Sequence, residues 1–277
     1  MNKKTTRTAM SVFLGLLSLV YIYPLFVILS NSFKLKTFIN LQPFQPPNSA
    51  TFIGLENYQV GIDHYGLLSG VGWSFIITIG SVAAILFFCS MFAWFITMVD
   101  TAYTKILYML CVFSMVVPFQ MVMFTLSKTA DTLRLNTPWG ITIIYLGFGT
   151  GLAVFLFSGF VKGIPLEIVE AATIDGCSPP ATFFQVAVPI MQPTFISIGI
   201  LQTMCIWNDF LLPSLVLDKR KYQTIPMIIQ MMRGSYGRVD WGAIMACLVM
   251  AVVPVVILYL SAQKHIIEGV AAGAVKG

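Results

Sequence analysis

Hydrophobic residues are gathered into six long windows separated by short polar stretches. Each window supplies the run of about 20 apolar residues that a helix needs to cross the hydrocarbon layer of a membrane. Apolar and polar residues do not alternate regularly within the windows, which favours helices over the strands of a membrane barrel. The pattern predicts an all-α polytopic protein, with one transmembrane domain over residues 1–277 and both termini on one side. The six transmembrane helices are expected at about 11–33, 71–98, 106–126, 139–161, 193–215 and 241–262.

Composition supports this fold class and excludes an ordinary soluble domain. Hydrophobic residues make up 57% of the chain and charged residues only 10%, and the mean hydropathy is +0.85, far from soluble averages. A basic tail containing Lys3, Lys4 and Arg7 precedes the first window. That window is long and has no clear small-residue cleavage site, so we expect an uncleaved anchor rather than a signal peptide.

The charges in the loops do not decide the orientation in the membrane, so the orientation is inferred from the N-terminal tail. Seven of the 16 Lys and Arg residues fall on the side of the termini and nine on the other, so the positive-inside rule does not decide between the orientations. The basic tail favours cytoplasmic termini, and this is the orientation adopted. The net charge of +5 is spread over many loops, which predicts contact with membrane lipid headgroups and no binding of nucleic acid.

Residue types that carry catalysis or bind metals are scattered along the chain. The five cysteines fall mostly inside the predicted spans without a CxxC pair, so neither disulfides nor a zinc site are indicated. His64 and His265 lie far apart, and there is no GxSxG, HExxH or phosphate-loop motif. We therefore expect no catalytic residues and no metal ligands.

The longest connection outside the spans covers residues 34–70. It contains Pro43, Pro46 and Pro47, and then the run Gly54 to Tyr58. This composition predicts an extended segment that leads to a short amphipathic piece on the outer face. A simple connector and a docking surface are both open for it.

The connection over residues 162–192 has helix signals of its own and is placed on the cytoplasmic side. Pro165 suits a first helical turn, and the residues from Leu166 to Asp175 have good helix propensity. Gly176 is expected to end this helix. The connection is long enough to suggest a function of its own.

A second short helix is expected after the glycine. Ser178 can cap it, Pro179 and Pro180 fit its first turn, and it should run to Val188 and stop before Pro189. The pattern predicts two short helices that meet at a glycine turn.

The exposed surface of the first short helix predicts a contact with another protein. Ala171 and Ala172 keep the exposed side thin, so that a partner can approach the backbone, while Glu170 and Asp175 offer charges. The alternative is an interfacial helix pair that packs only against its own bundle.

The same run resembles the signature loop of binding-protein-dependent ABC importer permeases, which reads E-A-A, three residues, G, nine residues, I-x-L-P. Gly176 and Pro189 match in spacing, while Val186 and Val188 stand where the family has isoleucine and leucine. Further resemblance lies in Trp207 to Leu211, Asp240-Trp241-Gly242, Val253-Pro254 and the tail Glu268 to Gly277. Together these runs are similar to the carbohydrate-uptake (maltose-type) branch over essentially the whole chain.

The resemblance implies a multi-pass permease subunit of the bacterial inner membrane that imports a sugar. Its implied partners are a sister permease in a heterodimer, two ATPase subunits and an extracytoplasmic sugar-binding protein. The chain would not be an enzyme and would bind no cofactor, because ATP and Mg²⁺ would be held by the ATPase subunits. The residues implied to couple to the ATPase are Glu170, Ala171, Ala172, Asp175, Gly176 and Pro189.

The resemblance also implies that the C-terminal tail reaches between the two ATPase subunits. The residues concerned are Gly273, Ala274, Val275, Lys276 and Gly277. A disordered chain end is the alternative.

Polar residues inside the predicted spans are candidates for the translocation path. A carboxylate at the centre of a span costs about 2.5–3.5 kcal/mol on insertion scales and usually faces a cavity or a partner. Asp209 with Asn208 and Trp207 is therefore a candidate pore, gate or sugar-contacting group, and helix packing is the alternative. Secondary candidates are Gln120, Asn136 and Gln202.

Two other classes of protein stay open. A secondary transporter of a small polar solute would show inverted repeats and buried ion-coupling carboxylates, of which only Asp209 is present. An integral membrane enzyme would need clustered reactive side chains, and none are evident. Within the importer class, polyols or phosphate-containing glycerol compounds remain alternative cargoes.

Overall fold

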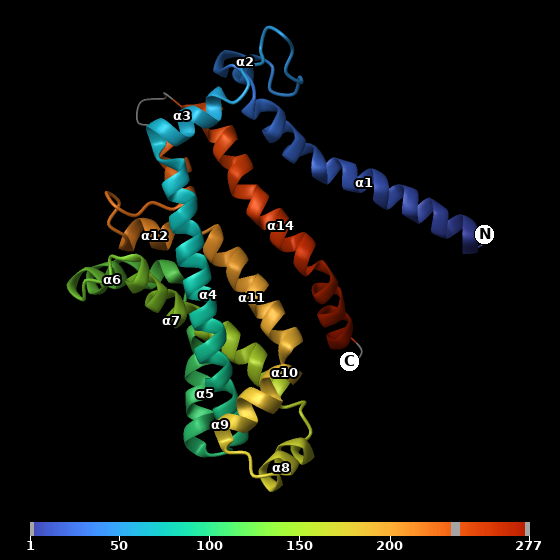
Figure 1. Cartoon of the computed structure of the whole chain (residues 1–277), viewed down its shortest axis with the longest axis vertical. Helices are drawn as coiled ribbons and strands as arrows, with labels where there is room; N and C mark the ends of the chain where they lie inside the picture. The colour runs from blue at the N-terminus through green and yellow to red at the C-terminus, as the bar shows by residue number, and fades with distance from the viewer. Residues whose placement is uncertain (1–2, 234–238, 275–277) are drawn as a thin grey trace. The chain divides into compact units, whose positions relative to one another are not determined.

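A computed structural model of the chain describes the backbone of residues 3–233 and 239–274, with side chains for residues 7–233 and 239–263. Helices dominate these residues (Figure 1), and β-pairing among them is limited to an isolated bridge between Lys34 and Phe52. The all-α prediction is confirmed. The helices are α1 Lys3–Ser32, α2 Lys36–Leu41, α3 Glu56–Tyr65, α4 Leu67–Met98, α5 Ala102–Ser114, α6 Phe119–Thr132, α7 Pro138–Val161, α8 Leu166–Ile174, α9 Pro179–Thr182, the π-helix Phe183–Ala187, α10 Val188–Ile190, α11 Gln192–Trp207, α12 Leu211–Val216, α13 Ile225–Met232 and α14 Trp241–Ala274.

Four of the described helices are long and apolar enough to cross a membrane. They cover Arg7–Ser32, Leu67–Met98, Pro138–Val161 and Trp241–Gln263. Two bent helix pairs bring the number to six if each pair is a single span, with bends of 101° between α5 and α6 and 76° between the segments on either side of Met191. A polytopic protein is confirmed, and the number six stays a prediction.

The third and fifth predicted windows are interrupted in the structure. Pro118 adopts an extended conformation at the N-cap of α6, so the window 106–126 contains a sharp bend. Proline has no N–H to continue the hydrogen-bond ladder of the preceding helix, which explains this break. The window 193–215 is also interrupted, because α11 ends at Trp207 and α12 starts at Leu211. Helix α11 therefore ends before the predicted end of the fifth span at residue 215, and the bounds of that span stay a prediction.

The chain divides into two compact units. The first contains Met1–Val71 and Met227–Pro254, and the second contains Gly72–Pro226 and Val255–Gly277. The apolar core of the first unit is formed by buried residues at the start of α4, in α13 and in α14. They are Leu67, Ile228, Met232, Ala243, Ile244 and Cys247.

Buried polar groups in the first unit order the connection that follows α1. The Lys34 ammonium is 1% exposed and donates to Asn31 Oδ1 at 3.1 Å and to the Gln42 carbonyl at 2.7 Å. Burial lowers the pKa of Lys34 below its ordinary value of 10.5. The Asn57 amide donates to the carbonyls of Ser32 and Lys34, each at 2.9 Å. The segment 34–70 is therefore a folded cap with two helices rather than only an extended connector.

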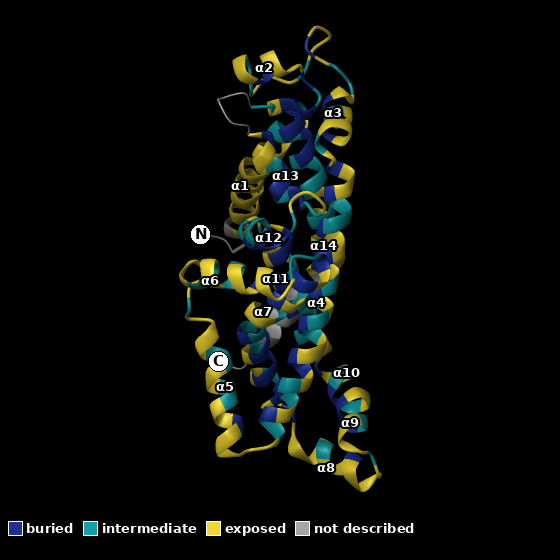
Figure 2. Ribbon diagram, turned by 90° about the vertical axis from the view of Figure 1, so that its left-hand side faces the viewer, coloured by how far each residue is buried: buried dark blue, intermediate teal, exposed yellow. Residues whose placement is uncertain are grey.

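Helix α7 is the central element of the second unit. It packs against α5 and α11, and α4 meets it through Ser81, whose hydroxyl donates to Thr142 Oγ1 at 3.4 Å. Gly149 allows the Ile85 side chain of α4 to approach the α7 backbone closely, at 2.5 Å from where a Cβ would stand. Half of the 24 residues of α7 are buried (Figure 2). Its two ends therefore hold the flanking segments in fixed places within this unit.

Candidate functional site

Helix α8 begins at Leu166 and ends in a glycine turn, as the sequence predicts. Pro165 is its N-cap residue and Gly176 follows it in the left-handed conformation, with φ of 84°. The N–H groups of Gly176 and Cys177 donate to the carbonyls of Thr173 and Ala172 at 3.0 and 2.9 Å. This pair of bonds is the Schellman motif, in which glycine avoids the steric cost of a left-handed residue.

The surface of α8 is almost entirely exposed (Figure 2). Glu170, Ala171 and Asp175 are exposed, and Ile174 at its C-terminal end is 85% exposed. Ala172 is 7% exposed, so the prediction that both alanines lie on the exposed side was wrong for Ala172. Adjacent helical residues point about 100° apart, which places one of the two toward the protein. Ile174, a large apolar side chain next to the turn, was not a candidate from the sequence.

The second short helix is longer than predicted and is anchored to α4. It continues through a π-helical turn, Phe183–Ala187, and through Pro189 to Ile190, so the expected end before Pro189 was wrong. A widened turn can accommodate a proline that lacks an N–H. Ser178 is its N-cap residue, but its side chain makes no capping hydrogen bond.

Aromatic contacts join this second helix to α4. The ring centroids of Phe183 and Trp94 are 6.1 Å apart, those of Phe184 and Phe87 are 6.4 Å apart, and the two phenylalanines contact each other at 4.9 Å. The Phe184–Phe87 pair is stacked and the Phe183–Phe184 pair is edge-to-face, and both arrangements are common for aromatic rings. An exposed α8 is therefore connected, through one glycine turn, to a segment fixed on a long helix.

The run Trp207 to Asp209 forms the break between α11 and α12. The Asp209 carboxylate accepts hydrogen bonds from Tyr145 Oη at 3.0 Å and from the N–H groups of Leu211 and Leu212 at 2.8 and 3.3 Å. It thus satisfies the first turn of α12 and fixes α12 to α7. Packing and capping are roles that this geometry supports directly.

The two neighbours of Asp209 lie in contrasting surroundings. Trp207 is 5% exposed and contacts the Phe75 ring at a centroid distance of 4.9 Å. Asn208 is exposed, and its amide donates to the Met204 carbonyl of its own helix at 2.8 Å. Of the three candidates, Asn208 is the one whose side chain is accessible in this chain.

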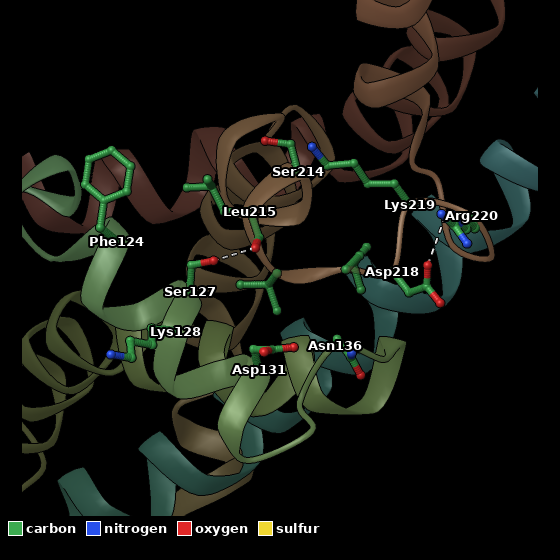
Figure 3. Close-up of a pocket in the computed structure, with 12 residues that line it drawn as sticks. Phe124, Ser127, Lys128, Asp131, Asn136, Ser214, Leu215, Asp218, Lys219 and Arg220 are labelled. Atoms are coloured by element: carbon green, nitrogen blue, oxygen red, sulfur yellow. Dashed lines mark hydrogen bonds between the residues drawn. The ribbon is translucent and has the colours of Figure 1, made fainter.

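A polar cavity lies near the opposite end of α7 from α8. It is formed by α6, the segment before α7, and the end of α12 with the loop that follows (Figure 3). Of its charged and amide residues, only Asn136 was a candidate from the sequence. The available signal was the presence of charges in both loops, 127–138 and 216–240, which the six predicted spans place together on the side opposite the termini.

Other sequence candidates are not brought together as a reactive site. Among the residues that the structure describes, no group of three or more His, Cys, Asp or Glu side chains could hold a metal ion. Gln202 is buried in α11, and its amide donates to the Gly149 carbonyl at 3.4 Å. Of the predicted ATPase-contacting tail, only the backbone of Gly273 and Ala274 is described, and residues 275–277 lie outside the described residues.

Comparison with known proteins identifies the family. The family model for the binding-protein-dependent transport system inner membrane component matches residues 76–271. The chain belongs to this family. The resemblance seen in the signature loop is thereby confirmed, and the chain is a transport permease rather than an enzyme.

Two curated relatives of this inner membrane component extend over nearly the whole chain. One is the probable starch degradation products transport system permease protein AmyC of Thermoanaerobacterium thermosulfurigenes, 38% identical over 277 residues and 100% of both chains. Another is the arabinooligosaccharides transport system permease protein AraQ of Bacillus subtilis (strain 168), 30% identical over 98% of this chain and 96% of the relative. Both are sugar-transport permeases, the branch that the sequence resembled.

A solved structure supports the fold. A chain from the crystal structure of a bacterial ABC transporter involved in the import of the acidic polysaccharide alginate superposes with a TM-score of 0.80. It is 19% identical, and the match covers 95% of this chain and 98% of that chain. The inner membrane component described here therefore has the fold of an ABC transporter permease.

Proposed function

We propose that this chain is one permease subunit of an ATP-driven oligosaccharide importer in the bacterial inner membrane. It would form half of the translocation pathway with a sister permease and receive sugar from an extracytoplasmic binding protein. Membership of the binding-protein-dependent family and the sugar permeases among the relatives support this proposal. ATP and Mg²⁺ belong, in this proposal, to two ATPase subunits and not to this chain.

The observation that carries the proposal is the exposed surface of α8. Leu166 and Ile174 are 58% and 85% exposed, beside the carboxylates of Glu170 and Asp175. Apolar side chains at the centre of a contact with charged groups around them are typical of a protein interface. We assign α8 and its glycine turn as the segment that docks on an ATPase subunit.

The anchoring of the neighbouring segment suggests how movement at α8 reaches the membrane. Closure of the ATPase dimer on ATP binding would move α8, and the Schellman turn at Gly176 would transmit that movement to the π-helical segment. Phe183 and Phe184 would then carry it to Trp94 and Phe87 of α4. Packed helices shift as rigid bodies, which is what alternating access requires.

Affinity purification from native membranes tests this assignment. The tagged chain is solubilised in detergent, and the co-purifying subunits are identified by mass spectrometry. We expect an ATPase and a second permease with the wild type, and loss of the ATPase but not of the permease with Glu170→Arg or Ile174→Asp. Glu56→Arg is the matched control, since Glu56 is an exposed carboxylate in the first turn of α3, and it should retain both partners.

Two outcomes would contradict these assignments. Recovery of the wild-type chain alone would contradict the importer proposal and support a self-sufficient secondary transporter. Recovery of the ATPase with both α8 variants as well as with the wild type would show that the docking segment lies elsewhere.

A further inference from the structure

The polar cavity of the second unit has a volume of about 730 Å³. Small-molecule sites in proteins usually enclose about 300–1,000 Å³, so this cavity has the size of a ligand site. In Figure 3, Asp131 and Asn136 lie along the lower side of the cavity, Asp218 lies near Asn136 on the right, and Phe124 lies at the left-hand edge. Phe124 is 73% exposed.

The cavity lining mixes hydrogen-bond donors and acceptors. Asp131 and Asp218 contribute carboxylates, Lys128, Lys219 and Arg220 contribute cations, and Asn136 contributes an amide that both donates and accepts. Among the residues that the structure describes, the only salt bridge joins Asp100 and Lys105. No salt bridge among the described residues therefore joins the charged side chains around the cavity, and Lys128, Asp131, Lys219 and Arg220 are exposed.

Hydrogen bonds across the cavity hold its two walls together. The Ser127 hydroxyl of α6 donates to the Leu215 carbonyl of α12 at 2.8 Å, and the Asp218 N–H donates to the Asn136 carbonyl at 3.1 Å. The Asp218 carboxylate also accepts from the Arg220 N–H at 3.1 Å, which shapes the loop. A site whose walls are already joined loses less conformational entropy when a ligand binds.

The position of the cavity relative to α8 indicates on which side of the membrane the cavity lies. Asn136 lies just before the first residue of α7, and α8 begins soon after its last residue. The 24 residues of α7 span about 36 Å at 1.5 Å per residue. If α8 docks on a cytoplasmic ATPase, the cavity faces the side from which cargo arrives. The cavity lining begins at Ser214 within α12, only a few residues after the accessible Asn208 in the sequence.

We propose that this cavity is a carbohydrate-binding subsite that receives an uncharged oligosaccharide on its way to the translocation path. Each sugar hydroxyl both donates and accepts a hydrogen bond, which matches a lining with groups of both kinds. The carboxylates repel an anion and the Lys and Arg side chains repel a cation, so a lining that carries both signs favours an uncharged ligand. The apolar face of a sugar ring can stack on Phe124. The inference rests on the proposed function, since the cargo-facing side follows from α8.

Saturation-transfer difference NMR tests for sugar binding directly. The complete importer is placed in lipid nanodiscs without its binding protein, and maltotriose, arabinotriose and raffinose are the probes. We expect saturation transfer to at least one trisaccharide, and a fall of about threefold or more in Phe124→Ala and in Asp131→Ala, as losing one good contact would give. Met121→Ala, on the same helix and 76% exposed, and Asp63→Asn, an exposed carboxylate outside the cavity, should keep the wild-type signal.

Two results would overturn the subsite. One is saturation transfer that is absent for all three probes or unchanged in both cavity variants. The other is unchanged saturation transfer together with a raised half-saturating concentration of binding protein in ATPase stimulation, which would make the cavity a protein contact. Co-purification of the ATPase is scored in the same preparations, so failure of the proposed function is seen separately from failure of the cavity to bind sugar.

Discussion

Two short motifs of this chain, Glu170 to Gly176 and Asp240 to Gly242, have opposite surroundings. In the second motif, Asp240 Oδ1 accepts from the Ala243 N–H at 3.3 Å and Oδ2 from Tyr65 Oη at 3.4 Å. Gly242 lies directly against the Asn57 side chain. In the first motif, Glu170 and Asp175 are exposed, and a Cβ at Gly176 would meet nothing within 4 Å.

This difference distinguishes a motif whose residues make contacts within the fold from a motif whose exposed residues are available for the proposed contact with an ATPase subunit. The Asp240 motif is explained by contacts within its own unit, so substitutions there should destabilise the protein. The α8 motif needs little of its surface for the fold, so substitutions of the exposed Glu170 and Asp175 should leave stability nearly unchanged and impair coupling. Measurements of stability and transport on the same variants therefore test this distinction between the two motifs.

The largest effect is expected for Gly176→Asp. A residue with a Cβ at φ of 84° is strained by about 1–2 kcal/mol, and an added charge at an exposed turn would disturb docking. We expect sugar transport in reconstituted vesicles to fall about tenfold or more, because a loss of about 1.4 kcal/mol already corresponds to a factor of ten. ATP hydrolysis should continue, so that hydrolysis is uncoupled from transport.

Gly54→Asp is the matched control for backbone strain. Gly54 also has a positive φ, 61°, with nothing within 4 Å of an added Cβ. It lies in the cap that follows α1 and far from α8 in the sequence, and transport should continue. Coupled transport by Gly176→Asp at the wild-type rate would remove the functional half of the comparison.

Gly242→Ala should give the largest loss of stability. An added Cβ would lie 2.7 Å from Asn57 Cγ, and Asn57 cannot move without losing its bonds to the Ser32 and Lys34 carbonyls. Overpacking of this kind costs about 1–3 kcal/mol. We expect thermal unfolding in detergent to shift down by several degrees. Gly72→Ala, which would meet nothing within 4 Å, should not lower the midpoint, and an equal shift in both would contradict the role given to Asn57.

The sequence predicted the helical class and the turn at Gly176 because both depend on local patterns. Apolar length and glycine conformation are readable from neighbouring residues. The broken fifth window was missed because Trp207 to Asp209 carries no glycine or proline. What ends α11 there is visible in the fold, since Asp209 caps α12 and bonds to Tyr145, 64 residues away.

The polar cavity could not be predicted for a similar reason. Its walls come from α6 and from the loop after α12, which are distant in the sequence and meet through Ser127 and Leu215. The buried face of Ala172 was misjudged because α8 shows no strong apolar stripe to give its direction. Pairings between distant residues and the rotation of a short helix are tertiary properties.

A smaller effect, about 1–2 kcal/mol, is expected for Asp209→Ala, which removes the cap of α12 and leaves the Tyr145 hydroxyl without its acceptor. Asn208→Ala should change stability by less than about 0.5 kcal/mol, because its side chain is exposed and bonds within its own helix. Thermal unfolding and transport are measured for both. Reduced transport by Asn208→Ala at unchanged stability would mark a pore role, while equal destabilisation by the two variants would contradict the division between them.

The smallest effect is expected for Tyr65→Phe, which loses the long hydrogen bond to Asp240 and so about 0.5 kcal/mol. Burial, followed by the charge and the hydrogen bond of Asp240, raises the pKa of Tyr65 above its ordinary value of 10.0. Because the folded state holds this proton more tightly, stability is unaffected below pH 10 and falls as pH rises from there toward the folded pKa.

The unfolding midpoint of wild type should therefore exceed that of Tyr65→Phe at pH 8, and the advantage should shrink above pH 10. Tyr103→Phe, at a side chain that is 65% exposed, is the matched control and should follow the wild-type pH profile. Parallel profiles for wild type and Tyr65→Phe up to pH 11 would show that the contact between α3 and Asp240 does not restrain the ionisation of Tyr65. The second motif would then be held by Gly242 and Asn57 rather than by its carboxylate.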